Sequence, residues 1–406
     1  MHPAPLSPFD LSDPETFADG VPHASFKRLR AEAPVSFCAE RNGGPGFFSI
    51  ASYAELVQIS KHPELFSSRL GTNIEDQPAA QLAQLQTILI NMDPPQHVKY
   101  RRLVRRGFTP RMIAEMTPHV RDLARETVDR VAAKGECDFV TEIAADLPLL
   151  VICELMGVPV ADRRRIFDLS NRLIGFDDPE FTNSPEDSLA AATEMWAYAH
   201  ALGQQRRERP LADLVSDLVN SDVDGEKLSE LEFNNFFLLL AVAGNETTRN
   251  AIAGGLLALM EHRGQWERLL SDRTLLDTAV DEIVRWVSPV IHFRRTATQD
   301  TQLGGVAIPS GSKLVMWYAS ANRDEKVFAR PDVFDVGRDP NPHVGFGIGE
   351  HFYLGSHLAK LEIRCLFEEL LRRLPDLELA APPKRLRSNF IHGIKQMPVR
   401  FTPEGA

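Results

Sequence analysis

Cysteine is scarce in this chain and is not arranged for cross-linking or zinc binding. Only four cysteines occur in 406 residues, and no Cys-x-x-Cys pair is formed by Cys38, Cys137, Cys153 or Cys365. Disulfide scaffolds and zinc knuckles need cysteines in closer patterns, so the sequence argues against both and favours a reducing compartment. The four cysteines are expected to be ordinary core residues.

Long hydrophobic runs, a secretion signal and an excess of basic residues are also missing. The longest apolar run, Phe236 to Gly244, is far shorter than the ~20 residues that a membrane span needs. The Pro-rich, acidic N-terminus has no basic segment followed by an apolar one, which argues against a signal peptide. A formal net charge of −11 disfavours nucleic acid as the main partner. These absences predict a soluble cytoplasmic protein without a membrane contact.

The apolar residues that are present recur mainly at helical spacing and predict a mainly α fold with a small β-rich subdomain. Helices are expected over 95–107, 119–134, 142–157, 186–206, 229–262 and 355–373. Short β-prone runs separated by Gly and Pro turns predict strands within 33–53 and 296–324. The polar stretch 71–87 is expected to be a mobile loop. No linker divides residues 1–406, so one domain is expected, with the first ~20 residues as an extended arm.

Four polar residues interrupt the longest helical candidate. In residues 245–248, Asn-Glu-Thr-Thr follows the small pair Ala243-Gly244. Buried polar side chains destabilise a helix unless they are paired or face a cavity. Small residues beside an acid and an alcohol suit a flat cofactor with proton delivery nearby. The alternative is that Thr247 bonds back to its own helix and Glu246 points to water.

Two further segments carry charged residues at helical spacing. Glu282 and Arg285 are three residues apart and can pair on one helix face, although a solvated pair is the simpler alternative. Asp93, followed by two prolines, is expected to cap the next helix. His97 and Arg101 share one face of that helix and could clamp a carboxylate or phosphate group.

The same helix holds the strongest basic cluster of an acidic chain. The cluster consists of Lys99, Arg101, Arg102, Arg105 and Arg106. It is either a solvated helix or a docking surface for an acidic partner.

A glycine-rich loop at Gly345, Gly347 and Gly349 leads into a helix that begins near Gly355. The spacing does not fit G-x-G-x-x-G, and the Gly-Lys-Ser/Thr ending of a phosphate loop is absent. Closely spaced glycines instead let the backbone approach a planar ligand. Tyr353 would lie just before the helix N-terminus, where positive potential favours an anion.

In their order and spacing, these segments resemble the soluble bacterial cytochrome P450 family, the haem-thiolate monooxygenases, over about residues 25 to 400. The resemblance implies the P450 fold, haem b, and two electrons from a ferredoxin-type donor. That donor would dock at a basic proximal face around Arg101, Arg102, Arg105 and Arg106. A monomer acting on a hydrophobic small molecule is expected.

The resemblance also assigns roles to individual residues. The structural charge network behind the haem would be Glu282, Arg285 and Arg338, and the proton-managing pair would be Glu246 and Thr247. The haem propionates would be held by His97, Arg101, Arg295 and His351, and the haem would lie against Phe346, Gly347, Ala243 and Gly244. Ile291 and Phe293 would belong to an apolar substrate pocket, which implies a terpenoid, steroid or aromatic substrate.

The chain departs from this family at the iron ligand. The family's loop reads F-G-x-G-x-H-x-C-x-G, and Tyr353 stands here at the cysteine position. Catalase-type haem proteins use a Tyr phenolate, and metal coordination should lower the phenol's ordinary pKa of about 10. Because tyrosine is longer than cysteine, the iron, the loop or the ring must shift, or Tyr353 fails to ligate.

Three functions therefore stay open. The first is a monooxygenase whose iron is ligated by Tyr353, which the intact Glu246–Thr247 pair favours. The second is a phenolate-haem peroxidase, peroxygenase or catalase-like enzyme, and the third is a non-catalytic haem or ligand-binding protein.

Overall fold

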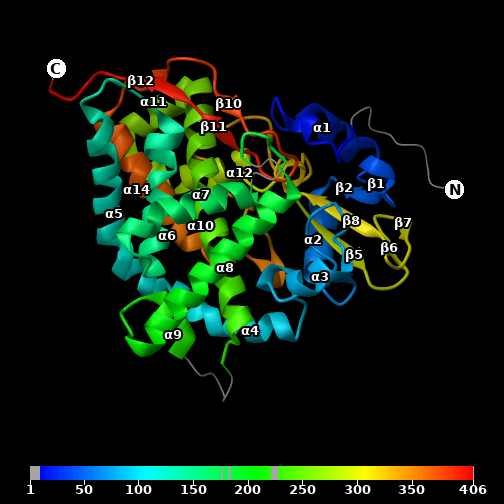
Figure 1. The fold of residues 1–406 in the computed structure, drawn as a ribbon. Helices are drawn as coiled ribbons and strands as arrows, with labels where there is room; N and C mark the ends of the chain where they lie inside the picture. The colour runs from blue at the N-terminus through cyan, green and yellow to red at the C-terminus, as the bar shows by residue number, and fades with distance from the viewer. Residues whose placement is uncertain (1–9, 175–176, 182–183, 221–226, 406) are drawn as a thin grey trace.

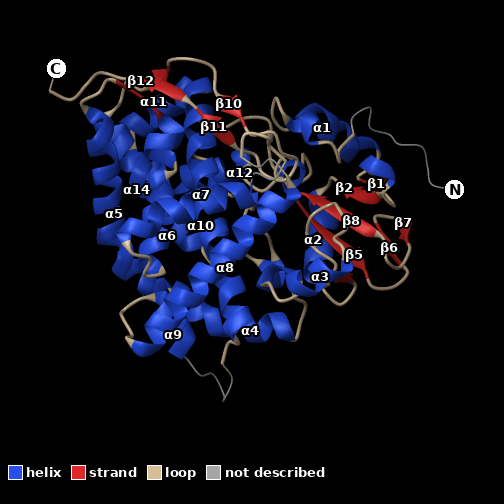
Figure 2. Cartoon of the chain, viewed as in Figure 1, coloured by secondary structure: helices blue, strands red, loops and turns tan. Residues whose placement is uncertain are grey.

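The computed structural model describes residues 10–174, 177–181, 184–220 and 227–405, and it separates a large helical region from a smaller β-rich one (Figures 1 and 2). The helices are α1 (His23–Glu32), α2 (Tyr53–Lys61), α3 (Ala79–Leu85), α4 (Gln96–Val104), α5 (Pro110–Ala132), α6 (Asp146–Leu155), α7 (Arg163–Ile174), α8 (Pro185–Glu208), α9 (Leu214–Asn220), α10 (Glu230–Glu261), α11 (Arg263–Ser271), α12 (Leu276–Val287), α13 (Tyr318–Ala321) and α14 (Ser356–Arg373). The strands are β1 (Val35–Cys38), β2 (Phe47–Ile50), β3 (Phe66–Ser67), β4 (Glu136–Asp138), β5 (His292–Ala297), β6 (Thr301–Leu303), β7 (Val306–Ile308), β8 (Lys313–Trp317), β9 (Glu378–Leu379), β10 (Lys384–Arg385), β11 (Ile394–Gln396) and β12 (Pro398–Arg400). The mainly helical fold class is confirmed.

Helix α10 is the centre of the helical region. A capping box begins it, because the Ser229 side chain accepts a hydrogen bond from the Glu232 N–H at 3.3 Å and Glu232 Oε2 accepts one from the Ser229 N–H at 2.8 Å. The helix packs against α6, α7, α8, α12 and α14, and its buried apolar residues belong to the largest core cluster. The expected helix over 229–262 is confirmed almost to the residue.

The β-rich region is built on a five-stranded sheet with the order β1-β2-β8-β5-β3 (Figure 2). Strands β2 and β8 pair in parallel, which joins two segments far apart in the sequence, and β5 pairs antiparallel with β8. Residues two apart in a strand point to the same face, so Phe293 and Arg295 of β5 face one cavity together. The sheet thereby delivers one apolar and one basic side chain to the site described below.

Three expectations about local structure are wrong. The stretch 71–87 is not a loop throughout, because Ala79–Leu85 forms α3. Helix α5 begins at Thr109 and Pro110 rather than near residue 119, since Pro118 lies inside the helix instead of ending the preceding segment. Asp93 does not cap α4. Its carboxylate instead accepts hydrogen bonds from the Ser67 hydroxyl and, at 2.8 Å, from the Ser68 N–H.

The N-terminal arm is folded onto the molecule where the structure describes it. Pro14–Phe17 forms a 3₁₀ turn, and the Leu11 and Phe17 side chains are 1% and 2% exposed. Residues 1–9 of the expected arm lie outside the described residues. Apolar contact with the third core cluster, which includes Phe26 and Trp317, explains why this segment is not extended.

The four cysteines are buried and free, as expected of core residues. Within the described ranges, the chain forms no helix that combines the length and apolar character needed to cross a membrane.

Candidate active site

A largely apolar cavity of about 370 Å³ lies between α10, β5 and the glycine-rich loop. Its apolar walls include Ile88, Ile90, Leu173, Leu238, Leu239, Val242, Ala243, Ala251, Val284, Val290, Phe293, Phe346, Phe390 and Ile391. Polar groups enter it at a few points, among them Thr247, Arg295, His351 and Tyr353. An apolar chamber with few convergent polar groups is typical of a small-molecule site.

The glycine-rich loop brings Tyr353 to this cavity. Gly347 and Gly349 have φ of 72° and 74°, the left-handed region that favours glycine, and the Tyr353 N–H donates to the Phe346 carbonyl at 2.9 Å. The Tyr353 ring stacks on Phe346 with centroids 6.2 Å apart and planes 15° apart. The tight loop therefore fixes the direction in which the phenol leaves the backbone.

The Tyr353 phenol reaches across to α10. Its hydroxyl lies 3.4 Å from the carbonyl oxygen of Ala243, to which it donates a weak hydrogen bond. Burial raises the pKa of Tyr353, and the charge of Glu362 on α14 raises it further. The phenol is accordingly neutral here, and one side chain connects the two walls of the cavity.

The polar residues in the middle of α10 lie in two different environments, one at the cavity and one buried within the protein. The Thr247 hydroxyl lines the cavity and donates to the same Ala243 carbonyl at 2.7 Å, so it does bond back to its own helix. Glu246 is fully buried, but it pairs with Arg249 rather than facing water. The Arg249 guanidinium also donates to Asn171 Oδ1 at 2.9 Å.

The pair of Glu246 and Arg249 is incompletely satisfied. Within the described part of the chain, Glu246 Oε1, Arg249 Nε and both amide atoms of Asn245 are buried without a hydrogen-bond partner. Burial raises the pKa of Glu246, and the positive charge of Arg249 opposes that rise only in part. The carboxyl is therefore suited to holding a proton.

Four basic side chains predicted to act together do lie together at one end of the cavity. The rings of His97 and His351 are 4.1 Å apart, and Arg295 and His351 line the cavity itself. Burial, followed by Arg101 and Arg295, lowers the pKa of His97 to about 4. Burial, Arg295, His97 and Arg101 likewise hold the pKa of His351 well below its usual range.

The charge at this cluster is not fully balanced. Glu350 Oε2 lies 4.0 Å from His97 Nδ1, which has no hydrogen-bond partner among the described residues. The cations depress one another's proton affinity, so an anion placed between them would be stabilised by charge-assisted hydrogen bonds.

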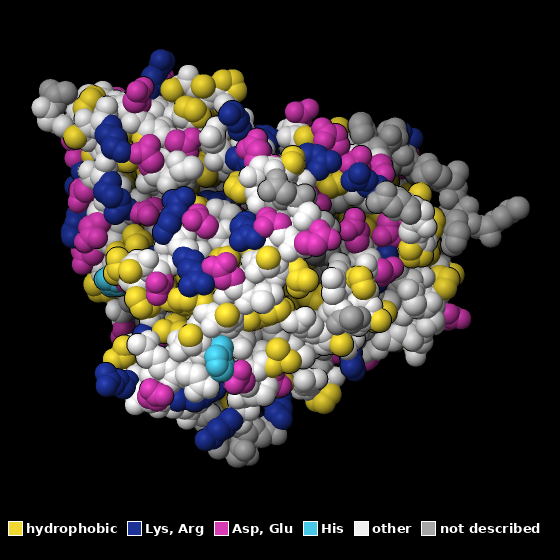
Figure 3. Space-filling view, viewed as in Figure 1, with side chains coloured by type: hydrophobic (Ala, Val, Ile, Leu, Met, Phe, Trp, Pro, Cys, Tyr) yellow, Lys and Arg dark blue, Asp and Glu magenta, His cyan; other side chains and the backbone are white. Residues whose placement is uncertain are grey.

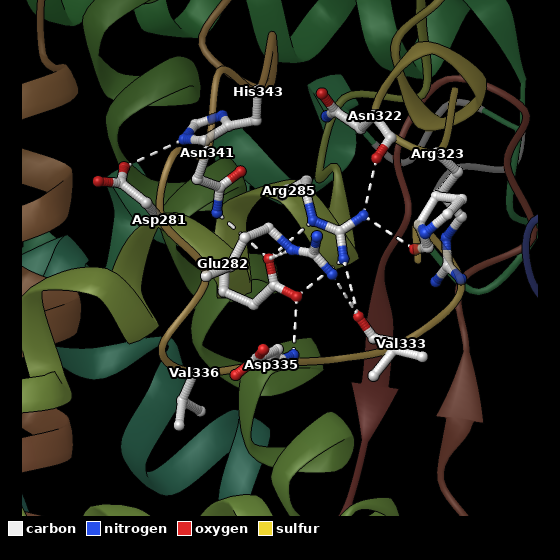
Figure 4. A network of polar contacts seen from close by, with 12 residues as sticks. Asp281, Glu282, Arg285, Asn322, Arg323, Val333, Asp335, Val336, Asn341 and His343 are labelled. Carbon is white, nitrogen blue, oxygen red and sulfur yellow. Dashed lines mark hydrogen bonds and ion pairs between the residues drawn. The ribbon is translucent and has the colours of Figure 1, made fainter. Parts of the chain in front are cut away.

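A second ionic network lies behind the loop (Figure 4). Glu282 Oε2 accepts from Arg285 Nε at 2.7 Å and from Arg338 Nε at 3.0 Å, and Asn341 adds a contact at 3.2 Å. Glu282 Oε1 accepts from Arg285 Nη2 at 2.8 Å and from the Asp335 N–H at 2.9 Å. The three residues assigned to one network by resemblance thus meet in one hydrogen-bonded group, in which Glu282 and Arg285 are fully buried and Arg338 is partly exposed.

Several assigned residues lie elsewhere than expected. Gly244 faces α6, where an added Cβ would lie 2.9 Å from the Ile152 side chain, so it allows helix packing rather than cofactor approach. Ile291 precedes β5 and packs into the third core cluster, and Val290 lines the cavity in its place. Arg101 is half-buried, and its guanidinium donates to the Phe352 carbonyl.

Some residues of the site were not anticipated. Arg249 follows Glu246 with the Glu-x-x-Arg spacing recognised at Glu282 and Arg285, so the same signal could have found it. Phe390 and Ile391 line the cavity from a segment near the C-terminus that carries no local signal of its own.

Comparison with known proteins points in one direction. The family model described as Cytochrome P450 matches residues 183–394. The chain is similar to a steroid C26-monooxygenase of Rhodococcus jostii, with 43% identity over 97% of this chain and 84% of that protein. It is also similar to a methyl-branched lipid omega-hydroxylase of Mycobacterium bovis, with 44% identity over 98% of this chain and 96% of that protein. A solved cytochrome P450 of Mycobacterium marinum in complex with pseudoionone matches with a TM-score of 0.91 and 39% identity, covering 99% of this chain and 100% of that one.

Proposed function

The chain belongs to the cytochrome P450 family, and from that premise we propose that it oxidises a bulky hydrophobic molecule at a haem b whose iron is ligated by Tyr353. As a member of the family it is a haem-dependent monooxygenase acting on a hydrophobic substrate. The observation that carries the finer proposal is that Tyr353 enters, from the glycine-rich loop, the same apolar cavity that Thr247, Arg295 and His351 line.

The side chains around the cavity fit a haem b. Haem carries two carboxylates on an apolar macrocycle, and the cavity joins an unbalanced basic cluster to apolar walls. The residues that would hold its propionates are His97, Arg101, Arg295 and His351, with the unpaired Nδ1 of His97 as one available donor among the described residues. Phe346, Gly347 and Ala243 supply the apolar surfaces on either side. When bound, haem b supplies the iron at which O₂ is activated with electrons from a redox partner.

Tyr353 is the side chain that would ligate the iron. A phenolate must form although burial raises the pKa of this phenol, so the charge of the metal has to compensate for the desolvation. The hydroxyl must also leave the Ala243 carbonyl, which it contacts only at 3.4 Å. Breaking that weak hydrogen bond costs about 1 kcal/mol or less. The ring would also have to turn out of the space between the loop and Ala243 that the haem would occupy.

Thr247 and Glu246 would manage protons beside the substrate. Thr247 places its hydroxyl in the cavity, and Glu246 holds a proton one residue away because burial raises its pKa. To deliver that proton, the carboxyl has to turn away from Arg249. Thr247→Val is expected to lower the product formed per electron consumed by about 10-fold or more, measured as product against NADPH oxidised.

The walls of the cavity support a terpenoid, steroid or aromatic substrate. Apolar side chains from α10, β5 and the C-terminal segment dominate the lining, so affinity would come mainly from buried apolar area. The names of the two relatives concern a steroid and a methyl-branched lipid, and the structural neighbour holds pseudoionone. A steroid is therefore the first choice within the proposed class, and a methyl-branched lipid is a further candidate outside it.

The experiment uses the haem-loaded protein with a ferredoxin, its reductase, NADPH and ¹⁸O₂. Three substrates are offered separately: a C27 steroid, a methyl-branched lipid and pseudoionone. We expect a product that carries one ¹⁸O atom from at least one of them. Haem-loaded protein that binds these molecules but forms no labelled product would contradict monooxygenation and support the non-catalytic binding alternative.

Peroxide-driven chemistry is the second candidate, and Tyr353 is the observation that favours it, because phenolate ligation is typical of catalase. The same protein is assayed with hydrogen peroxide in place of the ferredoxin, the reductase and NADPH. Peroxide-dependent product or O₂ release would support this candidate, and the absence of both would remove it.

A ferredoxin-type donor is proposed to dock on α4 and the turn after it, with the chain acting as a monomer. Lys99, Arg102 and Arg105 are exposed there, whereas Arg101 points to the loop and the Arg106 side chain lies outside the described part of the structure. The face shown in Figure 3 mixes Lys and Arg with Asp and Glu.

Charge reversal tests this docking surface. Arg102→Glu should slow reduction by the ferredoxin several-fold at low salt and less at high salt, since screening weakens the attraction. Arg28→Glu on α1, which lies far from α4 in Figure 1, is the matched control and should have little effect. Equal slowing by both variants would exclude the α4 surface.

A further inference from the structure

A second cavity, of about 300 Å³, lies outside the active site and shares no lining residue with it. It is bounded by the start of α1, the C-terminal part of α10, the end of α12 and the chain around β10 and β11. Neither the proposed haem site nor the substrate cavity accounts for it.

Four basic side chains line this cavity: His23, Arg323, Arg385 and His392. The Nδ1–H of His392 donates to the Val287 carbonyl at 2.6 Å, which leaves Nε2 to accept from Arg385 Nη1 at 3.5 Å. His392 is therefore neutral, and burial, with Arg385 and Arg323 nearby, lowers its pKa to about 4. The two arginines keep their charge.

Two of these side chains have donor groups with nothing to bind in the described structure. Arg323 is 7% exposed, and its Nε has no hydrogen-bond partner there; the Nδ1 of His23 is also buried and unpaired. The Arg323 guanidinium is held in place by the Trp286 ring, 3.7 Å from the ring centroid, and by Asp332 at 3.7 Å. A fixed, buried guanidinium with an unused N–H is a costly arrangement unless a ligand completes it.

The positive charges of the lining, on Arg323 and Arg385, are matched in number by two carboxylates that are not paired with them. Asp19 and Glu261 also line the cavity, but both are exposed, and no ion pair joins them to the four basic side chains within the described ranges. Helix α1 begins at His23 without a side-chain cap, which adds the partial positive charge of a helix N-terminus. Burial, and then Arg323, lower the pKa of His23 well below its usual range, although Asp332, 3.7 Å from Arg323, compensates part of the positive charge.

A metal ion does not fit this cavity, since no group of three or more metal-ligating side chains occurs among the described residues. We propose that the second cavity binds a small oxyanion, a carboxylate or phosphate group, held by Arg385, Arg323 and His23. The open side at Asp19 and Glu261 would admit the ligand, and the inner guanidinium of Arg323 would take one of its oxygens.

The test is calorimetric titration of the haem-loaded protein with inorganic phosphate and, separately, with acetate, at constant ionic strength against chloride. Haem-loaded protein is used because the basic cluster of the active site could bind the same anions when haem is absent. Saturable binding of phosphate, acetate or both beyond the chloride baseline is expected, and the tighter of the two identifies the preferred oxyanion. A signal no larger than that of chloride for both anions would overturn the proposal.

Two neighbouring residues of β10 give a matched pair of variants. Arg385→Gln should lower the affinity for the anion by about 10-fold or more, because it removes a charge-assisted hydrogen bond. Lys384→Gln removes the same charge one residue away, from an exposed side chain outside the cavity, and should leave affinity within about twofold. Equal weakening in both variants would show only a general charge effect and would also overturn the proposed site.

Discussion

Two buried Glu-x-x-Arg pairs of this chain share a spacing but differ in how completely their hydrogen-bonding groups are satisfied. Glu282 and Arg285 on α12 are both fully buried, and the carboxylate accepts hydrogen bonds from two arginines, an amide and a backbone N–H. Glu246 and Arg249 on α10 are also buried, yet Glu246 Oε1 and Arg249 Nε have no partner in the described structure.

This difference in hydrogen bonding suggests a structural role for the pair on α12 and a chemical role for the pair on α10. Every charged group of the Glu282–Arg285 pair is hydrogen-bonded, so the pair has no lower-cost arrangement to move to, and it fixes the backbone behind the loop that carries Tyr353. The pair on α10 can change its protonation or its partners, and it lies next to Thr247, whose hydroxyl faces the cavity. We therefore propose a structural role for the pair on α12 and a chemical role for the pair on α10, although their spacing in the sequence is identical.

Breaking the satisfied network should have the largest effect. Glu282→Ala leaves Arg285 and Arg338 without their carboxylate, and arginine cannot lose its proton to relieve the buried charge. We expect a loss of about 3–5 kcal/mol in the free energy of unfolding, measured by urea denaturation. Asp277→Ala, on the same helix but exposed and paired only with Arg364, should cost less than about 1 kcal/mol. Similar losses in both variants would contradict the structural role.

Breaking the unsatisfied pair should cost less and depend on pH. Arg249→Met leaves Glu246 buried, but a carboxyl can take up a proton, so we expect a loss of about 1–3 kcal/mol at neutral pH. Arg249 lowers the pKa of Glu246, so its removal raises that pKa further, while the unfolded chain still ionises near about 4.3. Below the raised folded-state pKa of Glu246 in the unaltered protein, both proteins hold this proton, and above it only Arg249→Met holds it. The loss of stability relative to the unaltered protein should therefore grow as pH rises above that pKa.

Urea denaturation at several pH values checks this trend. Arg268→Met removes an exposed arginine that pairs with Asp335, and it should show neither the cost nor the pH dependence. A loss that is independent of pH would mean that Glu246 does not take up a proton.

Removing the outer partner of the same pair should have the smallest effect. Asn171 accepts one hydrogen bond from Arg249 at 2.9 Å, and Asn171→Ala is expected to cost about 1 kcal/mol in the same assay. Asn171→Asp keeps the acceptor and should restore the lost stability. Destabilisation equal to that of Glu282→Ala would erase the distinction between the two pairs.

Much of the fold follows from local patterns in the sequence. The capping box at Ser229 and the apolar spacing on both sides of residues 245–248 define α10 to within a residue at each end. The predicted start of α5, near residue 119, is wrong because Pro118 lies inside the helix. A proline near the beginning of a long helix does not necessarily end the preceding turn. The short strands β3, β4 and β9 to β12 have two or three residues each, too few to produce a periodic signal.

Site residues could be predicted where the order and spacing of motifs along the sequence identify them. They could be predicted less well where the direction of a single side chain decides its role. His97, Arg101, Arg295 and His351 come together as the resemblance implies. Gly244 and Ile291 are misassigned. Gly244 lies on the face of α10 that packs against α6, and Ile291, just before β5, points into the core instead of the cavity. The roles of the residues that do meet the cavity stay proposals.

Spectroscopy of the haem-loaded protein tests the central claim, that Tyr353 ligates the iron. Ferric and ferrous–CO absorption and EPR spectra are recorded for the protein itself, for Tyr353→Phe and for Tyr353→Cys. The account predicts a phenolate signature that Tyr353→Phe abolishes, and a thiolate-type ferrous–CO band that only Tyr353→Cys gains. Spectra of Tyr353→Phe that match those of the unaltered protein, with haem bound in both, would contradict it.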